Sequence, residues 1–349
     1  MDTRDSRTHE KYQRLVSRAK SLPPVTTAVV HPCDLPSAVA ALEAFKLGLI
    51  APILVGPKAR VQEAAKAAGL DISGLEVVDS AHSHDSAAKS VDLVRQGKAE
   101  ALMKGGLHTD ELMGAVVARE TGIRTARRIS HCFVMDSPGH RDPLIVTDAA
   151  VNISPSMDDK VDIVQNAIDL AHAMGLPEVR VAILSAMETV NPKVASTIEA
   201  AALCKMADRG QITGGILDGP LALDNAISED AAAIKHIVSP VAGRANVLVV
   251  PDLEAGNMLA KSLTFLASAD AAGIVLNARG AHHSNQPCGL GDHTAGVLRG
   301  CEPGGGGEAP EHIGRHIVSQ GPTWSKAGHH CRRVMPCRQT VPLDVSRLS

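Results

Sequence analysis

Aromatic residues are nearly absent from this sequence: Phe, Trp and Tyr together make up 1% of its 349 residues. A core without them has to be built from Ala, Val, Ile, Leu and Met, which suits the packing of helices on a sheet. An excess of charge is also lacking, because charged residues make up 21% of the chain and the formal net charge is -3. This balance argues against a general affinity for nucleic acid or anionic membranes and favours a small-molecule partner.

Long apolar segments are missing as well. Every apolar run is far shorter than a membrane span, and the first residues, MDTRDSRTHEKYQRL, are charged and lack the apolar stretch of a secretion signal. We therefore expect a cytoplasmic protein without a membrane partner. The cysteines Cys33, Cys132 and Cys204 are scattered through the body of the chain, so they predict no disulfide framework there.

Several catalytic motifs do not occur. The chain has no G-x-x-x-x-G-K-[ST] phosphate loop, no G-x-G-x-x-G after a strand and no G-x-S-x-G nucleophile elbow. The use of ATP and dinucleotide binding of the common type therefore have little support.

What the sequence does contain is an alternation of short apolar runs with segments of helical period. The runs predict ten strands: TTAVVHP, APILVG, LEVVDS, EALMKGG, HCFVMD, LIVTDAA, VRVAILSA, ITGGILDGP, NVLVVPD and AGIVLNA. Segments such as DLPSAVAALEAFKLGL and DDKVDIVQNAIDLAHAMGL lie between them and predict helices. This alternation indicates an α/β fold with parallel strands and helices on both faces.

One break in the alternation lies at GIRTARRISHCFVMDSPGHRDP, where two short strands follow each other without a helix between them. This pattern predicts a β-hairpin, and we take it as the entrance to a second domain.

Ligands of such folds bind in the loops after the carboxyl ends of parallel strands. Here these loops read KGGLHTDEL, TDAAVNISP, SAMETVNPK, DGPLALDNA and PDLEAGNML, and they are rich in Gly, Asn, Asp, Thr and Pro. The same residues are ordinary turn and N-cap residues, so a single loop indicates little, and the group of five favours a ligand cleft.

Basic residues near these loops are candidates for binding an anion. Lys104 and His108 follow one predicted strand, although both side chains could equally be merely solvated. Arg127 and Arg128 precede another, and adjacent residues of an extended segment point in opposite directions. One of the two arginines can therefore face a cleft, where its planar fork of donors would suit a phosphate.

Six blocks of sequence together carry a resemblance to a known family. They are ALMKGGLHTDELMGAV, RRISHCFVMDSPG, TDAAVNISPS, METVNPKVASTIEA, DGPLALDNAIS and VPDLEAGNMLAKSL, in this order. With them, the chain from about residue 10 to about residue 280 resembles the phosphate acetyl/butyryl transferase family. The resemblance implies reversible transfer of a short acyl group between coenzyme A and inorganic phosphate.

The resemblance also implies an architecture. The family's fold is similar to that of isocitrate and isopropylmalate dehydrogenases, with two doubly wound α/β domains that flank a cleft, usually in a homodimer. Applied to this chain, it gives a first domain at residues 1–130 and a second at residues 131–280. The segment after them would return to the first domain and add a strand and a helix.

The substrates implied are acetyl-CoA, or another short acyl-CoA such as butyryl-CoA, and phosphate, with acetyl preferred because it is the commoner substrate of the group. Neither a metal nor a nicotinamide is implied, and coenzyme A takes part as a substrate. By motif position, Arg128 is a phosphate-binding candidate, and four residues are polar liners of the cleft: Asp148, Asn152, Asn191 and Asn225.

The chain departs from the family at Gly280. There the family continues with an apolar strand, a Ser-Arg pair and a nearby Asp, whereas this chain reads AHHSNQPCGLG. Read one base later, possible codons for the longer stretch GAHHSNQPCGLGDHTAGVLRGC, which begins at Gly280, spell A-P-I-I-L-T-S-R-A-D-S-V-T-T-R-L-A-S-C-A, which supplies all the missing features. We therefore hypothesise that the chain leaves its ancestral reading frame near codon 280, and that residues 281–349 form an aberrant, disordered tail.

The resemblance assigns the family's Asp the role of base for the coenzyme A thiol, its Arg that of phosphate ligand and its Ser that of a donor to the carbonyl. Because this chain does not contain the three at those positions, its catalytic residues are unknown and its activity is expected to be impaired.

Two other interpretations of the tail remain: a naturally divergent flexible segment, or a metal-binding segment built on His329, His330, Cys331 and Cys337. The spacing of these four residues matches no standard zinc module.

Two other classes of function also remain open. An inactive remnant would bind coenzyme A without turnover. A decarboxylating NAD(P)-dependent dehydrogenase of the same fold would need a cluster of Asp carboxylates for a divalent metal, and the sequence offers no convincing one.

Overall fold

The computed structural model describes residues 10–278 and 317–319. The first half of the chain contains α1 (Glu10–Lys20), β1 (Val25–Val30), α2 (Leu35–Lys46), β2 (Ile50–Gly56), α3 (Lys58–Ala67), β3 (Glu76–Asp79), α4 (Ser83–Arg95), β4 (Ala101–Lys104) and α5 (Thr109–Val117). The second half contains β5 (Ser130–Asp136), β6 (Leu144–Thr147), α6 (Met157–Ala173), β7 (Arg180–Leu184), α7 (Ala195–Asp208), β8 (Ile216–Leu221), α8 (Leu223–Ile227), α9 (Glu229–Ile234), β9 (Val247–Val249), α10 (Leu253–Phe265) and β10 (Asp270–Leu276), and β11 (Ile317–Ser319) follows.

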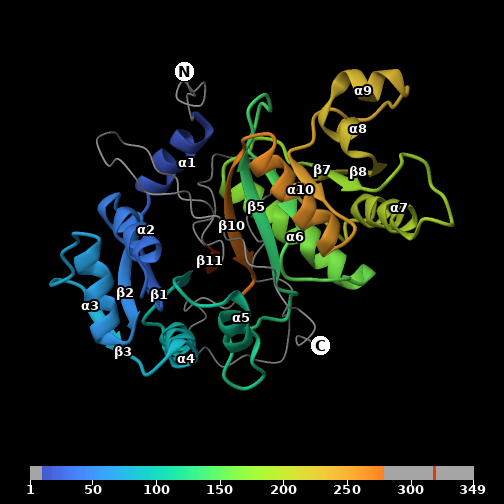
Figure 1. Cartoon of the computed structure of the whole chain (residues 1–349). Coiled ribbons are helices and arrows are strands. Elements are labelled where there is room, and N and C mark those ends of the chain that lie inside the picture. The colour runs from blue at the N-terminus through green and yellow to red at the C-terminus, as the bar shows by residue number, and fades with distance from the viewer. Residues whose placement is uncertain (1–9, 279–316, 320–349) are drawn as a thin grey trace, which may run out of the picture.

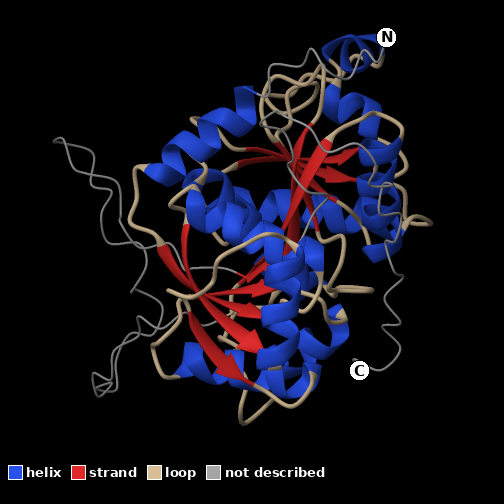
Figure 2. Cartoon of the chain, turned by 60° about the vertical axis from the view of Figure 1, so that its left-hand side comes forward, coloured by secondary structure: helices blue, strands red, loops and turns tan. Residues whose placement is uncertain are grey.

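The strands form one hydrogen-bonded sheet in the order β3-β2-β1-β4-β11-β10-β5-β6-β9-β7-β8. Each of the ten strands predicted from the apolar runs is present. Figure 1 shows the blue and cyan elements of the first half on one side and the green to orange elements of the second half on the other. The sheet is strongly twisted between the two groups of strands, as Figure 2 shows.

The sheet is mixed. β1 to β4 are mutually parallel, as are β6, β9, β7 and β8. Between the two groups, β5 pairs antiparallel with both β6 and β10. The β5 and β6 pair is the hairpin predicted from the break in the alternation. An α/β fold with parallel and mixed strand pairing is therefore confirmed.

The predicted tail at residues 281–349 lies outside the described residues except for β11. This three-residue strand pairs antiparallel with β10 and parallel with β4, and it joins the two groups of strands. The sequence predicted no strand at this position.

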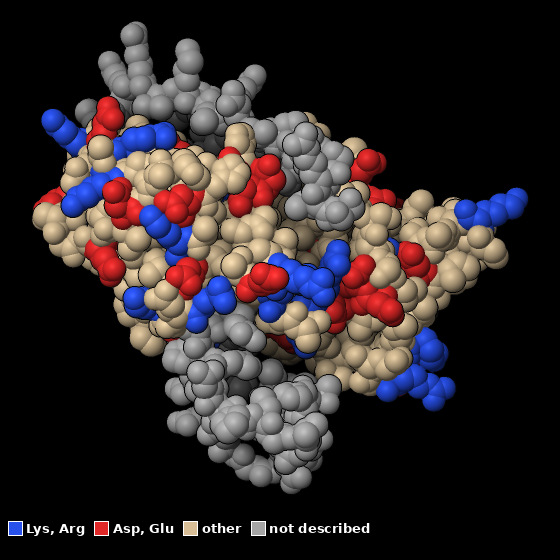
Figure 3. Space-filling model, turned by 90° about the horizontal axis from the view of Figure 1, so that it is seen from below, with Lys and Arg blue, Asp and Glu red and all other residues tan. Residues whose placement is uncertain are grey.

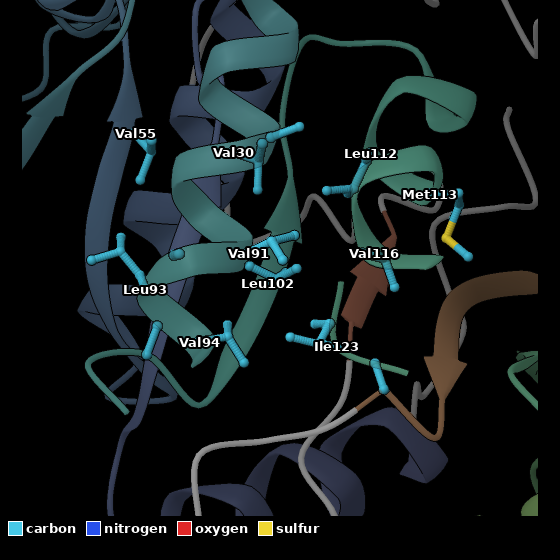
Figure 4. Packing of buried hydrophobic residues seen from close by; sticks show 14 of the residues in the cluster. Val30, Val55, Val91, Leu93, Val94, Leu102, Leu112, Met113, Val116 and Ile123 are labelled. Carbon is cyan, nitrogen blue, oxygen red and sulfur yellow. The ribbon is translucent and has the colours of Figure 1, made fainter. Parts of the chain in front are cut away.

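Helices cover both faces of the sheet, and three large apolar clusters lie beneath them. In the first half, α4 and α5 pack on the strands through residues such as Val91 and Leu112, which meet Val30 and Leu102 (Figure 4). In the second half, α6 and α7 pack on one face and the layer of α8, α9 and α10 on the other. All three clusters consist mainly of aliphatic residues with few aromatic rings, as the composition predicted.

The helix that lies nearest the candidate site begins with a capping box. The Ser156 side chain accepts a hydrogen bond from the Asp159 amide, and the Asp159 carboxylate accepts one from the Ser156 amide, so two free donors of the first turn of α6 are satisfied. Gly175, with a φ of +78°, follows the helix end, as the sequence predicted. The caps fix where α6 begins and therefore where its first acidic turn lies.

The surface carries both signs of charge. Lys and Arg side chains alternate with Asp and Glu side chains over the face shown in Figure 3. No helix among the described residues is both long and apolar enough to cross a lipid bilayer.

Candidate functional site

A buried carboxylate organises the loop after β6. Asp148 is 3% exposed, and its Oδ1 accepts hydrogen bonds from the amides of Ala150 and Val151, both at 2.9 Å. Its Oδ2 accepts from the His131 amide at 3.2 Å and from the Asn152 side chain at 2.6 Å. Burial raises the pKa of Asp148, and these hydrogen bonds oppose the shift. Because protein donors occupy both oxygens, Asp148 shapes the loop and leaves substrate contacts to its neighbours.

Asn152 connects this loop to Arg128. Its side-chain amide donates to the Ile129 carbonyl at 2.9 Å as well as to Asp148, and it is 2% exposed. Its Oδ1 accepts a hydrogen bond of 2.7 Å from Nε of Arg128. Arg128, Asn152 and Asp148 therefore form one chain of hydrogen bonds, and three of the residues that the sequence singled out lie together.

The Arg128 guanidinium is held on one side and open on the other. Its Nε lies 3.5 Å from Oδ1 of Asp159, in the first turn of α6, and the side chain is 53% exposed. Within residues 10–278, its two terminal nitrogens have no hydrogen-bond partner. Burial disfavours the charged form of Asp159, but hydrogen bonds from Ser156 and the charge of Arg128 outweigh it and lower the Asp159 pKa. The arrangement presents a fixed fork of donors to an incoming anion.

Arg127 points to another part of α6. Its guanidinium lies 2.7 Å from Oδ2 of Asp169, which is ten residues, or about 15 Å, along the helix from Asp159. The two arginines thus diverge, as their adjacency in an extended segment predicted. Each of them meets an acidic residue of α6, whereas the sequence suggested that one would face only water.

Lys104 and His108 lie at the end of β4, next to β1. Consecutive strands β1, β2 and β3 extend the sheet in one direction and β4 lies on the other side of β1, so the crevice between β1 and β4 is a topological switch point. Burial lowers the pKa of Lys104, and the nearby carboxylates of Asp34 and Glu111 oppose this effect. His108 is exposed at the start of α5, and its side chain makes no capping hydrogen bond.

Two glycines allow this crevice to close tightly. A Cβ atom on Gly105 would lie 2.4 Å from the Val30 carbonyl oxygen, and one on Gly106 would lie 2.1 Å from Oδ2 of Asp34. At Gly105 the neighbouring atoms belong to the backbone, so a side chain there would have to displace it, whereas at Gly106 the Asp34 side chain would have to move. The Gly-Gly pair therefore lets β4 end directly against the end of β1, with Lys104 at the edge of the contact.

Asn191 lies in the loop after β7, and Asn225 lies in the short helix α8 that follows β8. The Asn191 amide donates to Thr197 at 2.9 Å and its Oδ1 accepts from the Lys193 amide at 3.0 Å, which fixes a turn before α7. Asn225 is fully buried and donates to Glu188 at 3.3 Å, and its Oδ1 has no hydrogen-bond partner among the described residues. The Asn191 side chain therefore stabilises the backbone turn, whereas Oδ1 of Asn225 is left as a buried acceptor without a donor among the described residues.

The seven predicted residues thus lie in three groups: Arg128 with Asp148 and Asn152, Lys104 with His108, and Asn191 with Asn225, which follow the neighbouring strands β7 and β8. No hydrogen bond or ion pair between described side chains joins one group to another. In the same part of the chain, no group of three or more His, Cys, Asp or Glu residues is arranged to hold a metal ion.

Two acidic residues near these groups were missed. Asp159 contacts Arg128, and Glu188 accepts from Asn225 and lies 3.0 Å from Lys235. Asp159 was not among the predicted site residues, and the signal that could have found it was its place in the first turn of the helix that follows the loop TDAAVNISP. Glu188 lies inside the block METVNPKV but carries no spacing signal.

Comparison with known proteins places this geometry in a family. The sequence profile described as "Phosphate acetyl/butaryl transferase" matches residues 81–280. A phosphate acetyltransferase of Rhizobium meliloti is 64% identical over 269 residues, which cover 77% of this chain and 85% of that protein. A phosphate butyryltransferase of Clostridium beijerinckii is 40% identical over 267 residues, which cover 76% of this chain and 88% of that protein.

A solved structure supports the fold. The crystal structure of a phosphotransacetylase from Streptococcus pyogenes superposes with a TM-score of 0.65 at 23% identity, and the match covers 78% of this chain and 91% of that one. The profile match ends at residue 280, where the sequence analysis places the departure from the family pattern.

Proposed function

Because this chain belongs to the phosphate acetyl/butaryl transferase family, we propose that its reaction is the reversible transfer of an acetyl group between coenzyme A and inorganic phosphate. In the direction of acetyl-CoA synthesis, the thiolate sulfur of coenzyme A attacks the carbonyl carbon of acetyl phosphate. The bond between that carbon and the bridging oxygen breaks, and phosphate leaves with the oxygen. The enzyme class is acyltransferase.

The identities favour acetyl over butyryl. The Rhizobium meliloti phosphate acetyltransferase is 64% identical to this chain, whereas the Clostridium beijerinckii phosphate butyryltransferase is 40% identical over a segment of nearly the same length. Competition between acetyl-CoA and butyryl-CoA in one assay tests this preference, and a higher kcat/KM for butyryl-CoA would reverse it.

The observation that carries the proposal is the fixed guanidinium of Arg128. Asn152 holds Nε, and the terminal nitrogens stay open to bind the phosphate group of acetyl phosphate or free phosphate. Asp159 lies beside the Arg128 guanidinium and repels an anion, so the hydrogen bonds from Arg128 to the phosphate have to outweigh this repulsion. A phosphate bound there would also lie near the first turn of α6, whose amides favour negative charge.

Arg127 offers a matched control for Arg128. Removal of hydrogen bonds to a charged group costs about 1.5 to 3 kcal/mol, so Arg128→Gln is expected to raise the KM for phosphate about 10- to 100-fold. Arg127→Gln, which breaks the pair with Asp169 at the other part of α6, is expected to leave that KM within about threefold. Equal effects of the two substitutions would exclude Arg128 as the phosphate ligand.

For the phosphates of coenzyme A we propose the crevice between β1 and β4. Lys104 supplies a cation and His108 an exposed ring at the start of α5, and the nearby carboxylates of Asp34 and Glu111 oppose an anion there, so the attraction of Lys104 has to outweigh them. The loop that contains Asn191 and the helix α8 that contains Asn225 are proposed as the polar wall for the rest of the coenzyme. No metal or further cofactor is part of this scheme.

We further propose that turnover by this chain is impaired. In the family pattern, the base for the thiol and the donors to the carbonyl are an Asp and a Ser-Arg pair that follow the strand after Gly280, and this chain does not contain them at those positions. Each such group contributes on the order of 10²-fold or more to rate. A remnant that binds coenzyme A without turnover is the second candidate, and the end of the family match at residue 280 favours it over other classes.

An activity assay carried out beside calorimetry separates the two candidates. An impaired enzyme and a binding remnant both bind coenzyme A, but only the former releases measurable coenzyme A from acetyl-CoA when phosphate is added. Absence of both binding and turnover would remove the proposed function altogether.

The assembly implied by the family is a homodimer of two-domain subunits with the dehydrogenase-like arrangement, in the cytoplasm. The outer face of α10 supports a partner copy: Met258, Phe265 and Leu266 are spaced i, i+7 and i+8, and all three are well exposed. We therefore propose that a second copy of this chain covers α10. Light scattering, which measures the mass of the assembly, is expected to show a smaller dimer fraction for Phe265→Asp than for the parent chain. A dimer that persists unchanged would show that the interface lies elsewhere.

A further inference from the structure

The first helix lies over a hollow that the proposed function does not use. Tyr12, Leu15, Val16 and Ala19 form one face of α1, at the spacing of successive helix turns, and they look onto β5 and β10. Between the helix and the strands is a cavity of about 210 Å³.

Two polar contacts hold α1 above this cavity. At its start, Nζ of Lys11 lies 2.8 Å from Oδ1 of Asp136 and donates to the Ser137 carbonyl at 2.8 Å. Near its end, Nε of Arg18 donates to the Ala173 carbonyl at 3.2 Å, at the end of α6. The helix is thus anchored at both ends to the second half of the chain and bridges a gap in the apolar packing beneath its middle.

The walls of the cavity define what it accepts. Val134, Met135 and Ala272 line it from β5 and β10, Leu49 and Pro143 complete the lining, and the cavity is partly open to solvent. The charged groups in the wall, Lys11 and Asp136, are paired with each other and are 14% and 15% exposed, so a charged ligand would have to break that pair. The surroundings therefore favour a neutral, mainly apolar molecule over an anion or a cation.

The volume sets the size of that molecule. An apolar cavity of about 150 Å³ in another protein stays dry and binds benzene, so one of about 210 Å³ accepts a somewhat larger compound. We propose that the cavity under α1 is a binding site for a neutral apolar small molecule of the size of a substituted benzene. Its occupation fills the packing gap and stabilises the docked position of α1.

The site is separate from the proposed phosphate site. The cavity lies at the Asp136 end of β5, whereas Arg128 precedes the Ser130 end, and the strand between them is about 20 Å long. Binding of an apolar molecule is therefore expected whether or not the chain has transferase activity, so failure of one proposal leaves the other standing.

Toluene serves as the probe, and the full chain is used. Toluene at about ten times its dissociation constant is expected to raise the melting temperature by about 2 to 4 °C, and saturation-transfer NMR is expected to show contact between toluene and the protein. Cyclohexanol and benzoate at equal concentration test the preference for an apolar, uncharged ligand, and both are expected to give smaller shifts.

Cavity-filling variants locate the site. Ala272→Leu adds three carbon atoms to the floor and Val16→Phe fills the space from the helix, and either one is expected to abolish the toluene shift. The control is Ala67→Leu, the same substitution on the exposed end of α3, which is expected to keep the full shift.

Each outcome decides the proposal. A missing toluene shift together with missing saturation transfer in the parent chain would overturn it. If Ala272→Leu or Val16→Phe folds and toluene still raises its melting temperature as much as that of the parent chain, toluene binds elsewhere. Loss of the shift in that variant together with its retention in Ala67→Leu supports the site.

Discussion

Protonation of one buried histidine is expected to weaken the fold beside the candidate site. His131 is 3% exposed on β5, and burial lowers its pKa from 6.5 to about 4. Its amide donates to Asp148 and its carbonyl accepts from Thr147, so its backbone belongs to the network that holds the loop after β6. Among the described residues, Nδ1 of His131 has no hydrogen-bond partner, so nothing compensates a charge on the ring.

The sign and the size follow from the two pKa values. Because the folded chain binds the proton less tightly than the unfolded chain, the contribution of His131 to stability is complete above pH 6.5. It is lost as the pH falls toward 4. For a single site with these values, the loss is about 2 kcal/mol at pH 5 and about 3 kcal/mol at pH 4.

Urea unfolding at pH 7.5 and pH 5.0 measures this loss. His131→Leu places an apolar side chain of similar size next to Phe133. Between the two pH values, the free energy of unfolding of this variant is expected to fall by about 2 kcal/mol less than that of the parent chain. His108→Gln, at an exposed position, is expected to behave as the parent does. The same loss in parent and His131→Leu would refute the reasoning, because other titrating groups are common to both.

Two further substitutions test how α6 is held. Glu199→Gln leaves the ammonium of Lys160, which is 5% exposed, without its ion-pair partner and is expected to lower the free energy of unfolding in urea by about 3 kcal/mol. The control Asp208→Asn, in an exposed pair on α7, is expected to lower it by under about 1 kcal/mol. Equal losses would contradict the argument from burial. Ser156→Ala removes the cap of α6 and is expected to cost about 1 kcal/mol and to raise the KM for phosphate through displacement of Asp159; unchanged stability would show that the cap is dispensable.

Local patterns predicted most of the secondary structure. The ten apolar runs became ten strands, the Asp-rich start and the Gly175 end of α6 were readable, and two adjacent runs without a helix between them became the β5 and β6 hairpin. In each case the signal lies within a few residues of the element that it predicts, so no knowledge of distant contacts was needed.

Contacts between distant segments were not readable. The pairing of β5 with β10 joins residues more than 130 positions apart, and α1 docks on β5 and the end of α6 although it precedes both by more than 100 residues. The role of Asp148 was also hidden, because its partners are mostly backbone amides, which every sequence supplies. The family pattern supplied the candidate residues, and only the structure joined Arg128 to Asp148 through Asn152.

The central claim is that this is a phosphate acetyltransferase body whose catalytic segment is not encoded after Gly280. The direct test compares the 349-residue chain with a frame-restored chain, in which residues 1–279 are followed by A-P-I-I-L-T-S-R-A-D and the rest of the shifted reading. Both are assayed side by side for acetyl-CoA formation from acetyl phosphate and coenzyme A. We predict turnover by the frame-restored chain and a rate lower by on the order of 10²-fold or more for the 349-residue chain. Equal turnover by the two chains would contradict the account and would show that the catalytic groups lie elsewhere.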